Sequence, residues 1–370
     1  MERTHTFGVV GGYGATGSVV VTELLRSGDG TILIGGRDLN KATSSAAELG
    51  DRVSGARVNA LDARSLHDFC GRCSIIVNCA GPVSVTQDRV AQAAWRNRCH
   101  YVDVAGLSFV AQRLASQAQE ITDASLSFVV SAGWMPGITE LVPLYANAQA
   151  RTKMDTIESL TVYFGDSGEW SENALRDAVW YLRQAALRRP GYFHRGKWSR
   201  ARMAVASRKV DLGHPIGAGR FSLVSVPEQD TIGRQLADCD VFTYSYLSGF
   251  RTAAAAVLIA LLPLPERFSV RLVRNMFRRN RLPVDGFALA QVNGLSQGRR
   301  YVFTAQVAYR DRRDYWINGL VPAITARMIA ERRHIRHGVH FLGNAVDPIT
   351  FMAELKKAGV EQTESLKADD

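Results

Sequence analysis

The sequence contains no apolar run long enough to cross a membrane. The longest apolar stretch, Ala253 to Leu264, falls short of the roughly 18 residues that a spanning helix needs. The N-terminus enters an expected strand, Thr6 to Val10, within a few residues, which leaves no room for a secretory leader. We therefore expect a cytoplasmic protein.

Cysteine is also scarce, and the five cysteines, an odd number, do not indicate a disulfide framework. Cys70 and Cys73 have C-x-x-C spacing, but no second pair or histidine cluster accompanies them, so we expect no metal site. Cys73 comes just before an expected strand, whereas a redox pair needs a helix N-terminus.

Acidic side chains are fewer than basic ones, 35 against 45, which gives a formal net charge of +10. Such a charge indicates an acidic partner or substrate. The remaining composition, 46% apolar and 22% charged, is typical of a soluble globular protein, and 370 residues suffice for two domains.

A glycine-rich turn stands between an expected strand, Thr6 to Val10, and an expected helix, Ser18 to Leu25. In this context a G-x-G-x-x-G motif predicts dinucleotide binding, because backbone N–H groups and the helix dipole attract the pyrophosphate. Gly12 permits the turn, Gly14 lets the backbone approach the phosphates, and Gly17 lets the helix pack closely. The residues of the motif are Gly12, Tyr13, Gly14, Ala15, Thr16 and Gly17.

The second expected strand, Thr31 to Ile34, lacks the acidic residue that binds the ribose 2′-hydroxyl of NAD. Gly35 and Gly36 follow it, and then Arg37, whose guanidinium suits a 2′-phosphate. Lys41 adds positive charge one helical turn later. These residues predict NADP(H), although Asp38 opposes that interpretation.

Strands alternate with helices over about the first 150 residues, which predicts a doubly wound parallel α/β sheet of the Rossmann type. Ligands bind at the carboxyl ends of such strands. We expect Asp62 there beside the adenine, together with the turn made of Asn78, Cys79, Ala80, Gly81 and Pro82. We place this dinucleotide-binding domain at residues 1–135.

The middle of the chain, residues 136–335, predicts a second, α+β domain with a largely antiparallel sheet. Phe287 to Val292 and Arg300 to Tyr309 form an expected hairpin. We expect substrate selectivity and a homodimer surface here, and residues 336–370 should return to the first domain. The aromatic and polar candidates for substrate binding are Trp134, from the preceding loop, with Trp180, Tyr192 and His194.

A basic helix is expected within the middle domain, before the hairpin. Its arginines fall in one stripe, with Phe268, Leu272 and Met276 on the other side. A solvated face is the plainest interpretation; an acidic protein or a membrane surface is the sharper one. The stripe has no interleaved aromatics, which argues against nucleic acid. The arginines are Arg267, Arg271, Arg274, Arg278 and Arg281.

Three chemically useful side chains, His100, Tyr101 and Asp103, cluster at the end of an expected strand. Tyr101 and Asp103 share one side by alternation. As catalytic candidates they would protonate a substrate nitrogen or orient the donor that does. A loop-capping carboxylate is the alternative interpretation of Asp103.

Together these motifs resemble the saccharopine dehydrogenase-like reductases, over less than half of the chain. The middle domain lacks the Ser-Gly-Gly-Thr stretch of some members; Gly168-Glu169-Trp170-Ser171 stands there instead. The motifs are Gly12 to Gly17, Gly36-Arg37, Asn78 to Pro82, Tyr101 to Asp103, Gly133 to Gly137 and a tail from Pro348 to Val360.

The resemblance implies an NADPH-dependent reductase acting on C=N bonds. It includes stand-alone enzymes similar to thiazolinyl imine reductases of pyochelin-type siderophore biosynthesis, whose thiazoline is tethered to an acidic carrier protein. The basic charge and aromatic middle domain suit such a substrate. The alternatives are a saccharopine- or opine-type amino-acid dehydrogenase, an enoyl or quinone reductase, and a non-catalytic sensor of NADP(H).

Overall fold

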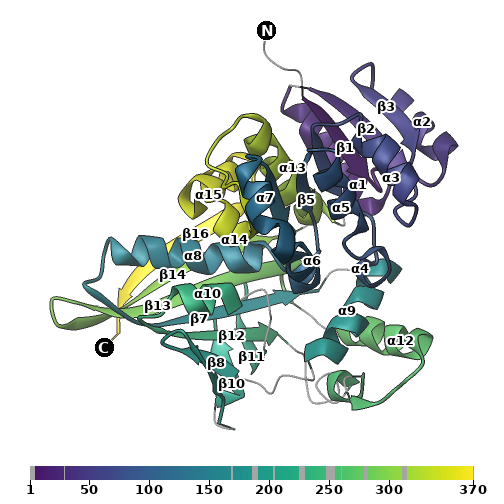
Figure 1. Cartoon of the computed structure of the whole chain (residues 1–370). Coiled ribbons are helices and arrows are strands. Elements are labelled where there is room, and N and C mark those ends of the chain that lie inside the picture. Colours follow the sequence, from purple (N-terminus) through teal and green to yellow (C-terminus); the bar gives the residue numbers. More distant parts are fainter. Residues whose placement is uncertain are drawn as a thin grey trace. The chain divides into compact units, whose positions relative to one another are not determined.

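The computed structural model describes residues 5–28, 30–167, 170–185, 191–202, 205–224, 230–246, 255–259, 261–278, 282–310 and 315–369. The chain divides into two compact units (Figure 1). The first comprises residues 1–138 and 313–355, and the second comprises residues 139–312 and 356–370.

The first unit is built on a seven-stranded sheet in which every neighbouring pair of strands is parallel, which confirms the expected Rossmann-type fold. The strand order is β15-β6-β5-β4-β1-β2-β3. The strands are β1 (Thr6–Val10), β2 (Thr31–Gly36), β3 (Val53–Arg57), β4 (Ile75–Asn78), β5 (His100–Asp103), β6 (Ser127–Val130) and β15 (Gly338–Phe341).

Helices pack along this sheet. α13 packs against α1, β4 and β5, whereas α5 packs against α3 and against β4 and β5. The helices are α1 (Ala15–Arg26), α2 (Leu39–Ala47), α3 (Ala63–Cys70), α4 (Val83–Thr86), α5 (Arg89–Arg96), α6 (Leu107–Leu114), α7 (Ala118–Asp123), α13 (Trp316–Ala330), α14 (Leu342–Ala345) and α15 (Pro348–Lys357).

The second unit is built on a nine-stranded sheet whose neighbours are antiparallel except for one parallel pair, β7 and β12. Its main strand order is β10-β11-β12-β7-β13-β14-β16. The strands are β7 (Thr156–Asp166), β8 (Gly191–His194), β9 (Lys197–Arg200), β10 (Ser207–Asp211), β11 (Ala218–Leu223), β12 (Asp240–Tyr246), β13 (Gly286–Ser296), β14 (Arg299–Tyr309) and β16 (Glu361–Ala368). The helices are α8 (Ile138–Arg151), α9 (Glu172–Ala185), α10 (Asp230–Gln235) and α12 (Glu266–Phe277).

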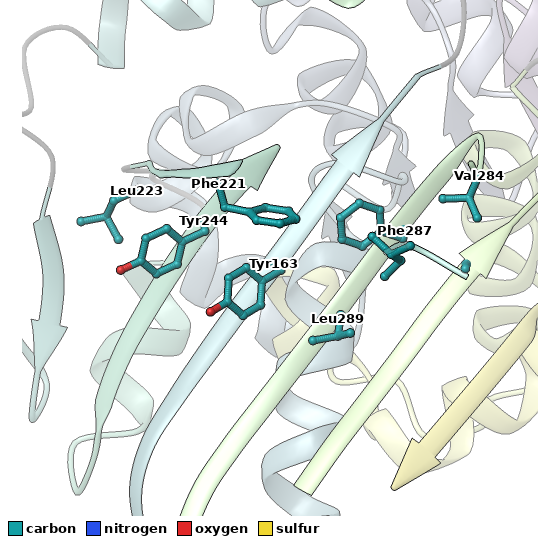
Figure 2. Packing of buried hydrophobic residues seen from close by; sticks show 9 residues of the cluster. Tyr163, Phe221, Leu223, Tyr244, Val284, Phe287 and Leu289 are labelled. Carbon is teal, nitrogen blue, oxygen red and sulfur yellow. The ribbon is translucent and has the colours of Figure 1, made fainter. Parts of the chain in front are cut away.

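An aromatic cluster forms the core on one face of the second sheet (Figure 2). Tyr163 stacks on Tyr244 at 5.5 Å between ring centroids and meets the edge of Phe221 at 5.2 Å. The expected hairpin between β13 and β14 is confirmed, with Gln297 and Gly298 both at positive φ in its turn. Positive φ at both positions matches the twist of antiparallel strands.

The boundaries of the two units differ from the expected ranges at the end of the chain. α13 is an almost wholly buried helix packed on α1 in the first unit, although the sequence placed it in the middle domain. Conversely, the tail does not return to the first unit throughout. β16 pairs with β14 along its whole length, in the second sheet. Within the described residues, no helix is both long and apolar enough to span a bilayer.

Candidate functional site

The loops at the carboxyl edge of the parallel sheet are hydrogen-bonded to the ends of the neighbouring strands. The backbone N–H of Gly11 donates to the carbonyl of Gly35 at 2.8 Å, and that of Cys79 donates to the end of β1 at 2.8 Å. Ala132 donates to the carbonyl of Asp103 at 2.7 Å. The loops that follow these strands therefore form one continuous edge of the sheet.

The glycine turn leaves the N-terminus of α1 open to a ligand. Gly14 caps the helix with no side-chain hydrogen bond, and the first turn carries no acidic residue. Gly14 and Ala15 are exposed. Exposed N–H groups at a helix N-terminus bind phosphate, so the motif fits the pyrophosphate of a dinucleotide.

Two glycines of this turn are required by close packing. At Gly17 a Cβ would lie 2.2 Å from the carbonyl oxygen of Gly11, which explains the tight approach of α1 to β1. Gly11 has φ +80°, and a Cβ there would lie 3.1 Å from the backbone of Cys79 and Ala80. The glycine turn thus packs directly on the turn that follows β4.

The end of β2 presents an available cation. Arg37 is exposed, and within the described part of the chain no interaction of its guanidinium is recorded. The carboxylate of Asp38, in contrast, caps α2 by accepting the N–H of Lys41 at 3.2 Å. The residue that opposed an NADP(H) interpretation is therefore engaged by its own helix.

Tyr13 fixes this end of β2. Its hydroxyl accepts the N–H of Asp38 at 3.1 Å, and a Cβ on Gly36 would lie 2.1 Å from its ring. The tyrosine therefore holds the backbone on which Arg37 is carried. The sequence placed Tyr13 in the motif but gave no sign of this contact.

The other two polar candidates near the adenine side are placed differently. Lys41 lies exposed in the first turn of α2, on the helix that Asp38 caps. Asp62 caps α3, accepting the N–H groups of Arg64 and Ser65 at 2.9 and 3.0 Å. Its carboxylate is therefore occupied by a structural task, and adenine contact stays a prediction.

The buried side-chain amide of Asn78 fixes the turn from Asn78 to Pro82. Asn78 accepts the N–H of Ala80 at 3.1 Å through Oδ1 and donates through Nδ2 to the Tyr101 hydroxyl at 3.2 Å. Burial, reinforced by the Asp103 charge, raises the pKa of the Cys79 thiol to about 12. Cys79 is therefore a neutral thiol, and the backbone of the turn is what it offers to a ligand.

Asp103 and Tyr101 lie beneath the edge rather than open to a crevice, because they are 2% and 0% exposed. Asp103 Oδ1 accepts the N–H groups of Gly106 and Ser131, the latter at 2.9 Å. Burial raises the pKa of Asp103 to about 6, although these N–H groups and the Tyr101 hydroxyl oppose the shift. Burial also raises the pKa of Tyr101 well above its usual value. The pair therefore holds the loops that follow β4, β5 and β6.

His100 does not join the other two candidates. It opens β5, at the opposite end from Asp103, and its Nδ1 accepts the N–H of Ser127 at 3.0 Å. Burial, with His337 as the next contributor, lowers the pKa of His100 to about 4. In a parallel sheet this end faces away from the ligand edge, so the expectation that His100 clusters at the site was wrong.

The loop after β6 adds residues that sequence reasoning missed. Ser131, at φ +64°, accepts the N–H of Leu107 at 2.9 Å, and Asn318 of α13 accepts the N–H of Trp134 at 3.0 Å. Trp134 itself is 2% exposed. It packs within the first unit, and a direct role in substrate binding stays a prediction. No sequence signal marks Ser131, and Asn318 lies far along the chain.

The remaining substrate candidates lie in the second unit on different elements. Tyr192 of β8 stacks on Phe242 at 4.5 Å between centroids, and His194 pairs with Asp240 at 2.8 Å. Trp180 lies on α9 and is half-buried. Tyr192 and His194 therefore lie on the same strand, β8, whereas Trp180 lies on a separate element.

Comparison with known families identifies the first part of the chain. Residues 7–187 match the family model described as the saccharopine dehydrogenase NADP binding domain. This match covers just under half of the chain and shows that its first part is similar to that NADP-binding domain. The matched residues contain the glycine turn, Arg37 and the Asn78 turn, and the match indicates NADP(H) as the cofactor.

The similarity of this chain to a curated relative is distant. A probable mitochondrial saccharopine dehydrogenase-like oxidoreductase of Arabidopsis thaliana is 26% identical over 161 residues. The match covers 40% of this chain and 36% of that relative, so the chain spans only about a third of its length.

Two solved structures share the fold over nearly the whole chain. The apo saccharopine dehydrogenase (L-Glu forming) from Saccharomyces cerevisiae superposes with a TM-score of 0.64 at 13% identity, covering 98% of this chain and 100% of that one. A probable dehydrogenase from Thermotoga maritima gives 0.51 at 8% identity, with 97% and 98% covered.

Proposed function

We propose that the protein is an NADPH-dependent oxidoreductase that reduces a carbon–nitrogen double bond. The observation that carries this proposal is the carboxyl edge of the parallel sheet, where an open helix N-terminus and an exposed Arg37 adjoin within a saccharopine dehydrogenase-type domain. Bound NADPH supplies a hydride for the imine carbon, and the nitrogen gains a proton.

The residues of this chain bind and position. The N–H groups at the start of α1 bind the pyrophosphate, and Arg37 pairs with the 2′-phosphate. Asp103 and Tyr101 hold the loops after β4, β5 and β6 in place, and these loops would position the cofactor and the substrate. Such positioning contributes because the reacting atoms must approach to about 3–3.5 Å.

For the substrate we propose an aromatic thiazoline carried by an acidic carrier protein. The aromatic pair Tyr192 and Phe242 offers a stacking surface in the second unit, and the net charge of +10 suits an acidic partner. The expected homodimer is part of this proposal, and light scattering tests it.

A second candidate is an amino-acid dehydrogenase of the saccharopine type. The whole-length fold likeness to the yeast enzyme supports it. Both candidates share hydride exchange at a carbon bonded to nitrogen; they differ in whether the substrate is a thiazoline or a secondary amine bearing carboxylates.

The experiment follows NADPH absorbance with the purified chain and a hydroxyphenyl-thiazoline thioester, free and carrier-bound. In parallel, NADP⁺ reduction is followed with saccharopine. Deuterium from C4-deuterated NADPH should appear on the carbon next to nitrogen in the product.

Each result has a clear meaning. Turnover of the thiazoline supports the first candidate, and turnover of saccharopine supports the second. Reduction of enoyl or quinone substrates alone would contradict both, and NADPH binding without turnover of any of these substrates would favour a sensor.

A further inference from the structure

A helix in the second unit turns aliphatic side chains to solvent. Residues 255–259 and 261 are helical. Val257, Leu258 and Leu261 are 56, 39 and 69% exposed, whereas Ile259 is 0% exposed and packs against α9 and α12. Spacings of three and four residues place the exposed three on one helical face, so an apolar face points away from the core.

Further exposed apolar side chains follow in the sequence. Leu262, four residues before the start of α12, is 46% exposed, and Phe268 in the first turn of α12 is 47% exposed. Phe268, expected on the other side from the arginines, does not belong to the buried side of α12, which Ser269, Val270 and Val273 form. We call the five exposed side chains the apolar patch: Val257, Leu258, Leu261, Leu262 and Phe268.

The arginine stripe of α12 lies next to the apolar patch. Arg267, Arg271, Arg274 and Arg278 are all exposed, as expected from their spacing; Arg281 lies outside the described residues. Phe268 and Arg271 are neighbours at i and i+3 on the same helix. Phe268 of the apolar patch is thus a direct neighbour of the arginine stripe on α12.

An open hollow of about 850 Å³ lies between α9 and α12, lined by all four arginines of the stripe. Arg176 of α9 also lines it and pairs with Glu266. Glu172 and Glu266 are the acidic side chains of the lining, so the hollow is strongly cationic. Guanidinium groups bind phosphate oxygens as bidentate partners.

The positive charge of this surface helps to decide among three possible partners: a second copy of the chain, an acidic protein and an anionic membrane. A two-fold contact between copies of this chain would pair the surface with itself and bring two arginine stripes together. An acidic protein would pair with the arginines through charge, but this pairing does not explain why the aliphatic side chains of the apolar patch are exposed. A basic amphipathic surface with leucine and phenylalanine on its apolar side is typical of helices that lie in the interface of anionic membranes.

We propose that the apolar patch and the arginine stripe form a docking surface for an anionic phospholipid membrane. The aliphatic side chains and Phe268 enter the boundary between headgroups and acyl chains, and the arginines bind the lipid phosphates. The attachment is peripheral, since the described helices contain no membrane span.

The test is cosedimentation of the purified full chain with vesicles. One set is phosphatidylcholine alone, and the other is phosphatidylcholine mixed two to one with phosphatidylglycerol. Binding should be strong only to the mixed vesicles and should fall as salt rises, because surface charges are screened beyond about 8 Å near physiological ionic strength.

Two variants separate the apolar and ionic contributions. Val257→Asp with Leu261→Asp should abolish binding by placing carboxylates at the lipid boundary. Arg271→Glu, Arg274→Glu and Arg278→Glu together should lower the partition coefficient by about a hundredfold or more, at roughly fivefold per basic residue. The circular dichroism spectrum, the melting temperature and NADPH affinity should be unchanged in both variants, which shows that both units fold.

Matched controls carry the same chemical changes on other exposed positions. Arg72→Glu, Arg96→Glu and Arg299→Glu together control the charge, and Leu49→Asp with Ile349→Asp controls the apolar change. Both controls should retain binding within about threefold, a difference below one charge contact.

Three results would overturn the proposal. The wild type could ignore both kinds of vesicle. The arginine variant could lose binding while the Val257→Asp, Leu261→Asp variant keeps it, which would indicate a purely ionic surface for an acidic protein. Light scattering could also show a wild-type dimer that the apolar variant converts to a monomer, which would assign the patch to self-association.

Discussion

Asp103 is the residue whose role depends most on its surroundings. A carboxyl group with a pKa near 6 suits a proton donor, yet Oδ1 of Asp103 is committed to two backbone N–H groups and the side chain is 2% exposed. Both features come from the same burial. A positioning role and a proton-donating role therefore predict different consequences of one substitution.

The buried carboxyl makes stability depend on pH in a specific direction. The folded pKa of about 6 exceeds the usual value near 4, so the folded protein holds a proton that the unfolded chain releases. The resulting stabilisation is complete below about pH 4 and is lost as pH rises through about 6, a change of about 3 kcal/mol. Asparagine does not titrate.

We therefore predict that the free energy of unfolding of wild type, minus that of Asp103→Asn, falls by up to about 3 kcal/mol between about pH 4 and pH 7. Paired urea titrations across this range measure it. A pH-independent difference would contradict the assigned burial. In an activity assay of Asp103→Asn, a reduced rate with an unchanged pH profile would establish that Asp103 positions the loops. Loss of the titration near pH 6 from the pH–rate profile would instead establish that Asp103 transfers a proton.

Two glycines of one motif should respond in opposite ways. Gly14 has an ordinary extended backbone and an exposed position, and a Cβ there would lie 3.1 Å from the carbonyl oxygen of Gly11. At Gly17 the same distance would be 2.2 Å. A side chain at Gly14 therefore intrudes on the ligand, and one at Gly17 intrudes on the fold.

We predict that Gly14→Val keeps its circular dichroism spectrum and loses NADPH affinity by about a hundredfold or more, the loss of about two charge-assisted hydrogen bonds. Gly17→Val should instead lower the melting temperature clearly. Fluorescence titration and thermal melts distinguish the two. Retained NADPH binding in Gly14→Val would place the phosphates elsewhere.

At the scale of elements, the strands and helices with a clear period were predictable and their partners were not. β1, β4 and the β13–β14 hairpin were confirmed because buried runs and turn glycines specify them locally. α13 was misassigned because its sequence is apolar all round, which says that it is buried but not against what. β16 was missed because its alternating, mostly exposed residues resemble a solvated tail.

The packing of α13 on α1 makes a prediction about cofactor affinity. At Gly319 a Cβ would lie 2.5 Å from Val19 Cβ and 2.9 Å from the Thr16 carbonyl oxygen. Gly319→Val should push α13 away from α1, at a cost of about 1–3 kcal/mol in stability. The pyrophosphate, for which we propose the N-terminus of α1 as the site, is common to both cofactors. Affinity for NADPH and affinity for NADH should therefore fall by the same factor.

Calorimetric titration of both cofactors with the Gly319→Val variant measures this. A changed ratio of the two affinities would contradict the account, because only the end of β2 distinguishes the cofactors.

For the whole molecule, the sequence indicated the cofactor-binding edge of the parallel sheet more clearly than it indicated the catalytic residues. Three short motifs can be interpreted without knowledge of the rest of the fold: the glycine turn, Gly36-Arg37 and the Asn78 turn. His100 was misplaced because it is the first residue of the four-residue strand β5, so the length of the strand lies between it and the ligand edge at Asp103. The capping roles of Asp38 and Asp62 depend on where their helices begin.

The central claim is that this edge binds NADP(H) through Arg37, and paired titrations of NADPH and NADH test it most directly. The wild type should bind NADPH about 10–100-fold more tightly, the contribution of a charge-assisted bidentate contact. Arg37→Asp should reverse the preference, and Arg96→Asp, an exposed arginine on α5, should leave it unchanged. Equal affinity of the wild type for the two cofactors would contradict the claim.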